Sequence, residues 1–268
     1  MVKLKDISHL IVDMDGVLYR GDAPLPGLQA FFAFLRERPI PFVLATNNST
    51  QTPQQRVQKL ARMGVQILPQ EVLNSGQATA RALARDYPPG TRVHVFGSPA
   101  LREAVTEEGF VLADENVELV VASMDWDVTY DKLKRAALLV RGGARFVATN
   151  LDPTQPTNEG LLPGTGSLIA ALRAATDTEP LVVGKPEPTM FQLAMDQMGA
   201  RPETTATIGD RLDTDILGAQ RAGLITICML SGSTSSRAEA EAYCCDFIFL
   251  GIAELLAAWK RELRDRHA

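Results

Sequence analysis

Residues 10–17 read LIVDMDGV, and this stretch decides the fold. A short apolar run ends in two carboxylates one residue apart, Asp13 and Asp15, and then a glycine. A run that is short, β-branched and bounded by a turn signal is typical of a buried parallel strand. Open α/β sheets bind their ligands at the carboxyl ends of such strands. Side chains two positions apart in an extended chain point the same way, so both carboxylates are expected to face one crevice, about 6–7 Å apart.

Two carboxylates this close repel each other, and one of them takes up a proton unless a positive charge lies between them. A hard divalent cation with oxygen ligands relieves that repulsion. The same letters also fit an ordinary solvated turn, because Asp and Gly are common turn residues. The stretch alone leaves both interpretations open.

Composition excludes several classes of protein. The chain has 268 residues, of which 46% are hydrophobic and 22% charged, as in a soluble globular protein. A net charge of -5 offers no basic surface for nucleic acid, and no apolar run reaches membrane-spanning length. The first residues lack the apolar region of a secretory signal, and the three cysteines form no zinc or disulfide pattern. We therefore expect a cytoplasmic protein with neither a nucleic-acid nor a membrane partner.

Short apolar runs alternate along the chain with stretches of helical spacing, which predicts an α/β fold with a parallel sheet. The pattern restarts between about residues 77 and 178, where a middle region has enough apolar segments to close a small α/β core of its own. Residues 153–166, rich in Pro and Gly, are expected to form a loop. The expected strands after the first lie at residues 41–45, 93–96, 119–122, 146–148, 205–208, 224–230 and 247–249.

Polar groups follow several of these runs. The second strand leads into Thr46–Ser49, a later one into Asp210 with Asp213 and Asp215, and Lys185 stands in a Gly-Lys-Pro turn. Carboxyl ends of parallel strands share one edge of the sheet, so these groups are expected to converge there. Each group taken singly has a plainer explanation. Thr46–Ser49 could cap a helix, Asp210 to Asp215 could form a solvated loop, and Lys185 could lie in a surface turn. Together they form a set that holds a divalent metal and a phosphoryl group at once.

The chain resembles a known family in four motifs, which occur in the family's order. They are Asp13-x-Asp15-Gly-Val, Thr46-Asn47-Asn48, Gly184-Lys185-Pro186 and Gly209-Asp210-x-x-x-Thr-Asp215. They resemble the motifs of the haloacid dehalogenase superfamily, most closely its NagD-like, para-nitrophenyl-phosphatase branch. Residues 148–152 (ATNLD) and 162–167 (LPGTGS) are similar to that branch's large α/β cap of the C2 type. Haloacid dehalogenases themselves lack the second aspartate of the first motif, so Asp15 favours a phosphatase.

The resemblance implies a Rossmann-like three-layer parallel-sheet core with an inserted α/β cap domain. Residues 1–77 and 180–268 would form the catalytic core, and residues 78–179 the cap that selects the substrate. A homodimer through the cap would fit the family, but no exposed apolar stripe in the sequence indicates one, so the oligomeric state stays open.

The resemblance also implies roles. Asp13 would attack phosphorus and form an aspartyl-phosphate, and Asp15 would protonate the leaving oxygen and then activate water. Mg²⁺ would be held by the side chains of Asp13 and Asp210 and by the backbone carbonyl of Asp15. Lys185 would bind phosphate oxygens, and Asp215 would orient Lys185 or a metal-bound water.

Further residues would contact the substrate. Thr46, Asn47 and Asn48 would do so from the second motif, and Asn150 and Asp152 from the cap; a plain Asx turn is the alternative for the last two. Family members with a histidine in the following turn use it on an aromatic substrate. This chain has Gln155 there, which counts against a pyridoxal-phosphate preference.

These observations predict a Mg²⁺-dependent phosphatase acting on a small phosphorylated metabolite. A phosphotransferase or mutase that passes the phosphoryl group to a hydroxyl is the nearest alternative. A non-catalytic sensor of a phosphate ligand is an alternative from another class, although such a binder has no use for an acid–base residue. A dinucleotide-binding protein is disfavoured, because no Gly-x-Gly-x-x-Gly follows the first strand.

Overall fold

The structure is a computed structural model and describes residues 2–157 and 159–264. The chain divides into two compact units. Unit 1 comprises Met1–Thr46, Pro53–Leu73 and Lys185–Ala268, and unit 2 comprises Asn47–Thr52 and Asn74–Gly184.

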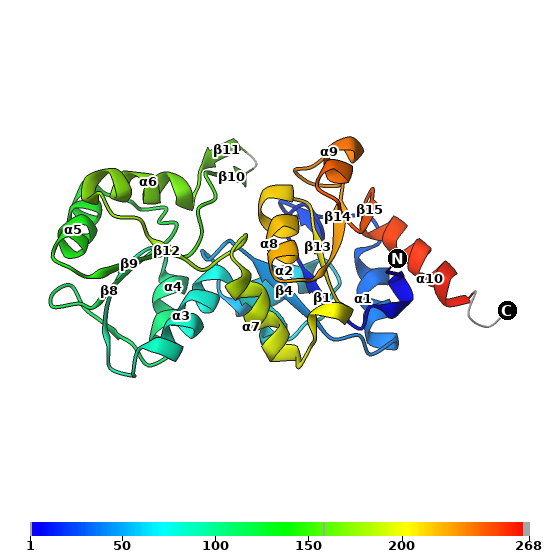
Figure 1. Ribbon diagram of the computed structural model, residues 1–268, viewed down its shortest axis with the longest axis horizontal. Helices are drawn as coiled ribbons and strands as arrows, with labels where there is room; N and C mark the ends of the chain where they lie inside the picture. The colour runs from blue at the N-terminus through cyan, green and yellow to red at the C-terminus, as the bar shows by residue number, and fades with distance from the viewer. Residues whose placement is uncertain (1, 158, 265–268) are drawn as a thin grey trace. The chain divides into compact units, whose positions relative to one another are not determined.

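Unit 1 is built on a six-stranded sheet (Figure 1). Its strands lie in the order β15 (Phe247–Phe249), β14 (Ile225–Met229), β13 (Thr205–Gly209), β1 (His9–Val12), β4 (Phe42–Thr46) and β5 (Val72–Asn74). The central strand β1 pairs in parallel with β13 on one side and β4 on the other. The predicted parallel sheet is therefore confirmed, and β1, which carries the deciding stretch, lies in its middle.

Both faces of β1 are covered, which explains its unbroken apolar sequence. Leu10 and Val12 pack into the main core cluster with residues of α1 and α10, whereas Ile11, on the opposite face, is only 1% exposed. Helix α7 contacts β1 and β4. The helices of unit 1 are α1 (Leu28–Glu37), α2 (Pro53–Arg62), α7 (Pro188–Met198), α8 (Leu217–Arg221), α9 (Arg237–Ala242) and α10 (Ile252–Arg264).

Unit 2 has its own parallel sheet of five strands. The order is β12 (Leu181–Val182), β9 (Arg145–Ala148), β8 (Leu119–Ala122), β6 (Arg92–Phe96) and β7 (Val111–Leu112). Its helices are α3 (Ser75–Asp86), α4 (Pro99–Glu107), α5 (Tyr130–Arg141) and α6 (Thr165–Thr176). The short strand β12 pairs with β9, so only two residues separate the last strand of this sheet from Lys185.

One segment differs from its sequence-based prediction. Residues 153–166, expected to be a loop, contain an antiparallel hairpin of β10 (Thr154–Thr157) and β11 (Gly160–Pro163). Proline has no backbone N–H to donate within a sheet, so it occurs mainly in edge strands. The prolines of this segment therefore favoured a loop over strands in the sequence-based prediction. A second small hairpin, β2 (Tyr19–Arg20) with β3 (Ala23–Pro24), follows the deciding stretch in unit 1.

No helix in the described part of the chain combines the length and the apolar character needed to cross a membrane.

Candidate active site

Three neighbouring strands of unit 1 end at the same edge of the sheet. Val12 of β1 is paired with Ile208 of β13 and Leu44 of β4, so the next residues of all three strands emerge side by side. Asp13 follows β1, Asp210 follows β13, and Thr46, which is buried, is the last residue of β4. This convergence is what parallel pairing predicted from the sequence.

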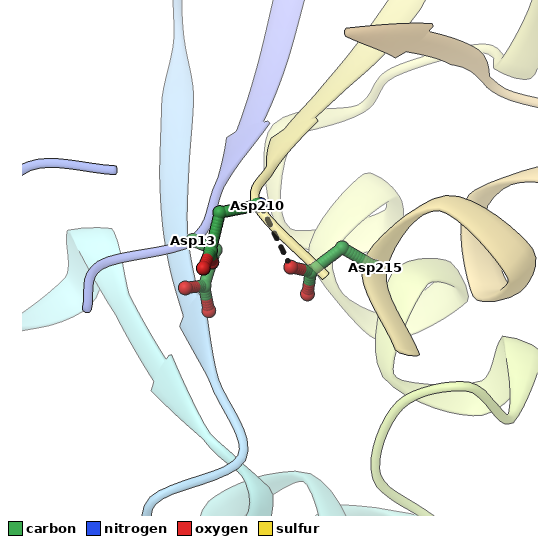
Figure 2. A group of neighbouring side chains, drawn as sticks. All are labelled: Asp13, Asp210 and Asp215. Carbon is green, nitrogen blue, oxygen red and sulfur yellow. Dashed lines mark hydrogen bonds between the residues drawn. The ribbon is translucent and has the colours of Figure 1, made fainter. Parts of the chain in front are cut away.

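Three carboxylates gather at this edge (Figure 2). One oxygen atom each from Asp13, Asp210 and Asp215 lies within 4.8 Å of the others. Asp215 is 1% exposed, and its Oδ2 accepts hydrogen bonds from the backbone N–H groups of Asp210 (3.2 Å) and Arg211 (3.1 Å). The turn between β13 and α8 therefore folds Asp215 back onto the strand end that carries Asp210.

Lys185 supplies the positive charge of the cluster. Its Nζ donates to Oδ1 of Asp13 at 2.6 Å, to Oδ1 of Asp215 at 2.6 Å and to the Ala45 carbonyl at 3.0 Å. The residue is 3% exposed, so the ion pairs lie out of bulk solvent.

The electrostatics leave an excess of negative charge. Burial raises the pKa of Asp13 well above its usual range, and Asp215 and Asp210 raise it further, against the opposing effect of Lys185. Burial and the charge of Asp215 raise the pKa of Asp210 to about 6. Burial alone would lower the pKa of Lys185, but the attraction of Asp13 and Asp215 outweighs it and raises that pKa. A hard divalent cation fits this set, because carboxylate oxygens are its preferred ligands and its charge offsets the excess.

Asp210 is held by the loop after β14. The Ser233 N–H donates to its Oδ2 at 2.5 Å, and the Thr234 N–H donates to its backbone carbonyl at 3.0 Å. Gly232 and Gly16 lie so close that a Cβ on either would overlap the Asp210 carboxylate, and Gly16 has a φ of +83°. Both glycines are therefore needed to let the backbone approach this side chain.

Asp15 lies in a different environment from the three clustered carboxylates. Its side chain is 44% exposed, and its Oδ2 is 3.9 Å from Nη1 of the buried Arg56. Arg56 also donates to the hydroxyl of Tyr19 at 3.1 Å. Sequence analysis missed Arg56 and Tyr19. A signal was present, because Arg56 stands one helical turn before the buried Leu60 of α2 and hence on its inward face.

The remaining predicted residues belong to unit 2. Asn47 donates from Nδ2 to the Asp152 carboxylate at 3.1 and 3.3 Å, and Asn150 donates to the Asn47 carbonyl at 2.8 Å. Asn150 also accepts from the Asp152 N–H at 3.1 Å, and Asn48 accepts from the N–H and hydroxyl of Thr50. The structure thus brings three of the four together as a hydrogen-bonded group. Their contacts with substrate stay predictions.

Comparison with known proteins agrees with this geometry. Two family models match, haloacid dehalogenase-like hydrolase over residues 10–111 and HAD-hydrolase-like over residues 182–255. The chain is 38% identical over 230 residues to an acid sugar phosphatase of Staphylococcus aureus (strain USA300), covering 85% of this chain and 88% of that protein.

Solved structures resemble it along almost its whole length. The 4-nitrophenylphosphatase from Thermotoga maritima matches with a TM-score of 0.89 and 36% identity, covering 94% of this chain and 97% of that chain. NagD from E. coli K-12 matches with a TM-score of 0.87 and 34% identity, covering 92% and 98%. A glycerol phosphate phosphatase from Mycobacterium tuberculosis, solved in complex with magnesium, matches with a TM-score of 0.87 and 33% identity, covering 94% and 77%.

These matches confirm the resemblance drawn from the four motifs and the α/β fold with an inserted cap domain. The chain therefore belongs to the haloacid dehalogenase-like hydrolases, in their NagD-like branch of phosphatases.

Proposed function

We propose that this protein is a Mg²⁺-dependent phosphatase that hydrolyses small phosphate monoesters through an aspartyl-phosphate on Asp13. The observation that carries the proposal is the contact of Lys185 with Asp13 beside Asp210 and Asp215. Oδ1 of Asp13 is engaged by the ammonium, which fixes the carboxylate and leaves Oδ2 to act as the nucleophile.

The reaction takes place in two halves. Oδ2 of Asp13 forms a bond to phosphorus as the bond to the ester oxygen breaks, and Asp15 gives that oxygen a proton. Asp15 then takes a proton from water, whose oxygen attacks the phosphorus and releases phosphate and free Asp13. Lys185 and Thr46 hold phosphate oxygens in both halves, and Asp215 keeps the Lys185 ammonium in place.

The carboxylates of Asp13 and Asp210 would hold the magnesium ion, together with the backbone carbonyl of Asp15. Bound there, the cation screens the repulsion between an anionic nucleophile and an anionic phosphate. The donor set supports this assignment because it consists of oxygen atoms alone, and a relative of the same fold was solved with magnesium.

The substrates we propose are phosphorylated sugars and polyols. The relatives named above are an acid sugar phosphatase and a glycerol phosphate phosphatase, which supports this class. Unit 1 would be the catalytic core and unit 2 the cap. Asn47, Asn48, Asn150 and Asp152 would contact the alcohol part of the ester. A cytoplasmic location stays a prediction from the sequence, and the oligomeric state stays open.

Substitution of Asp13 tests the mechanism. We expect Asp13→Asn and Asp13→Ala to abolish phosphate release from 4-nitrophenyl phosphate and from a panel of sugar phosphates, while the wild-type rate requires Mg²⁺. Asp213→Asn is the matched control, because Asp213 lies in the same segment as Asp215 but is 62% exposed and paired with Arg211. Full activity in pure Asp13→Ala protein would overturn the proposal. Transfer of the phosphoryl group to added glycerol rather than to water would assign a phosphotransferase instead.

A further inference from the structure

Arg56 is a charged residue placed inside the core of unit 1. It is 2% exposed and shares the inward face of α2 with Leu60. Its Nη1 makes polar contacts with the Tyr19 hydroxyl at 3.1 Å and with Asp15 Oδ2 at 3.9 Å. Its Nε and Nη2 are buried without a hydrogen-bond partner among the described residues. A buried cation with unused donors is costly to a fold, so this arginine does not serve stability alone.

Tyr19 connects Arg56 to the backbone of the loop that carries Asp15. The tyrosine is fully buried, and its carbonyl accepts the N–H of Gly16 at 2.8 Å. An isolated parallel bridge joins Tyr19 to Asp15 itself. The guanidinium, the phenol and the backbone of Asp15 therefore form one packed assembly in which the first two cannot move freely.

The carboxylate of Asp15 has the opposite character. It is 44% exposed, so neighbouring side chains do not enclose it, and its orientation depends on electrostatic attraction. Lys59 is a second cation near Tyr19, with Nζ 4.0 Å from the centre of the Tyr19 ring and 3.8 Å from the exposed Asp22. Arg56 is thus the buried, fixed charge that faces Asp15, whereas Lys59 reaches the surface.

We propose that Arg56 is a positioning residue that, braced by Tyr19, holds the Asp15 carboxyl group in the orientation required to protonate the leaving oxygen. This inference rests on the proposed function, in which Asp15 is the acid. A fixed charge preorganises a catalytic group, because it removes orientations that do not lead to reaction.

The leaving group of the substrate provides a specific readout. Phenol is a weaker acid than 4-nitrophenol, so phenolate departs poorly without a proton and 4-nitrophenolate departs readily. Acid–base assistance typically accelerates a reaction by about 10²–10⁴-fold, and a misplaced Asp15 would lose part of that acceleration. We expect Arg56→Met to lower kcat/KM for phenyl phosphate by about tenfold to a hundredfold and for 4-nitrophenyl phosphate by less than about threefold. Arg56→Lys should recover part of the loss, because it restores the charge.

Two controls separate positioning from folding. Arg62→Met makes the same substitution at an exposed position of α2 and should change neither rate. In an Asp15→Asn background, Arg56→Met should lower kcat/KM for phenyl phosphate by less than about twofold. The effects of the two substitutions are not additive if Arg56 acts through Asp15. Circular dichroism and thermal unfolding of each variant show whether it folds, and Tyr19→Phe provides a second, milder perturbation of the same assembly.

This inference would be overturned if Arg56→Met lowered kcat/KM equally for both phosphate esters. It would also be overturned if Arg56→Met lowered kcat/KM by the same factor in the wild-type and Asp15→Asn backgrounds. Neither result bears on the proposed function, which is tested separately by the activity of Asp13→Ala and by phosphoryl transfer to glycerol.

Discussion

The ammonium nitrogen of Lys185 lies 2.6 Å from Oδ1 of Asp13, although the two residues are 172 positions apart. Asp13 follows the central strand of unit 1, and Lys185 is the first residue of the chain after it leaves unit 2. The contact therefore depends on the returning chain entering unit 1 at the carboxyl end of β1. It also ties the insertion point of unit 2 directly to the proposed nucleophile.

Replacing Lys185 by methionine should abolish activity and destabilise unit 1. The substitution leaves two buried carboxylates, Asp13 and Asp215, without their cation, and breaking a buried ion pair in this way costs about 3–5 kcal/mol. Urea unfolding of the metal-free protein measures the loss. Adding Asp13→Asn to Lys185→Met should recover part of the stability but none of the activity, because one uncompensated charge disappears with the nucleophile. If the double variant is no more stable than Lys185→Met, buried charge is not the cause.

Magnesium should stabilise the protein through Asp210. A ligand that binds only the folded state raises stability by about 2.7 kcal/mol at a concentration 100 times its Kd. We expect Mg²⁺ to raise the midpoint of thermal unfolding and EDTA to reverse the shift. In Asp210→Asn the shift should be lost, whereas Asp213→Asn, on the exposed side of the same turn, should retain it. A full shift in Asp210→Asn would place the ion elsewhere.

The sequence predicted the site residues that directly follow the strands of the parallel sheet. Asp13 and Asp210 follow neighbouring parallel strands, and parallel pairing alone brings them to one edge. Lys185 was expected at the same edge, and the resemblance of the Gly-Lys-Pro motif pointed to the same place. The strand before it, β12, belongs to the sheet of unit 2, however, so pairing with β1 does not bring Lys185 there. The structure shows its contact with Asp13 at 2.6 Å.

Residues that act through side-chain packing were missed. Arg56 is charged, so a hydrophobicity pattern assigns it to solvent, although its spacing from Leu60 places it inward. The β10–β11 hairpin was missed for a related reason, since its segment contains prolines and few β-branched residues. In both cases tertiary contacts overrode the local preference of the residues.

His94 should make the stability of the protein depend on pH. Burial, with the charge of Arg102, lowers the pKa of His94 below its usual 6.5, against the opposing effects of Asp114 and the Ala113 backbone. The unfolded chain therefore binds the proton more readily, and the contribution of His94 is complete above about pH 6.5 and lost as the pH falls through the lowered pKa. Urea unfolding between pH 7.5 and pH 5 should show a shallower pH dependence in His94→Gln. Asp114→Asn, which removes the negative charge 3.0 Å from Nδ1, should steepen it. An unchanged slope in both variants would contradict this assignment.

Gly232→Ala should impair the proposed metal site without altering the rest of the fold. A Cβ at this position would overlap the Asp210 carboxylate, whose Oδ2 accepts the N–H of the next residue, Ser233. Either the carboxylate or the loop after β14 must move, and either change disturbs the position of Asp210 Oδ2. Gly251→Ala is the matched control, because a Cβ there meets only Ser231 at an ordinary contact distance of 3.6 Å. We expect Gly232→Ala to weaken the Mg²⁺-induced thermal shift and to raise the Mg²⁺ concentration needed for half-maximal phosphatase activity, and Gly251→Ala to change neither. Equal Mg²⁺ requirements in the two variants would show that the close approach of this loop does not position Asp210.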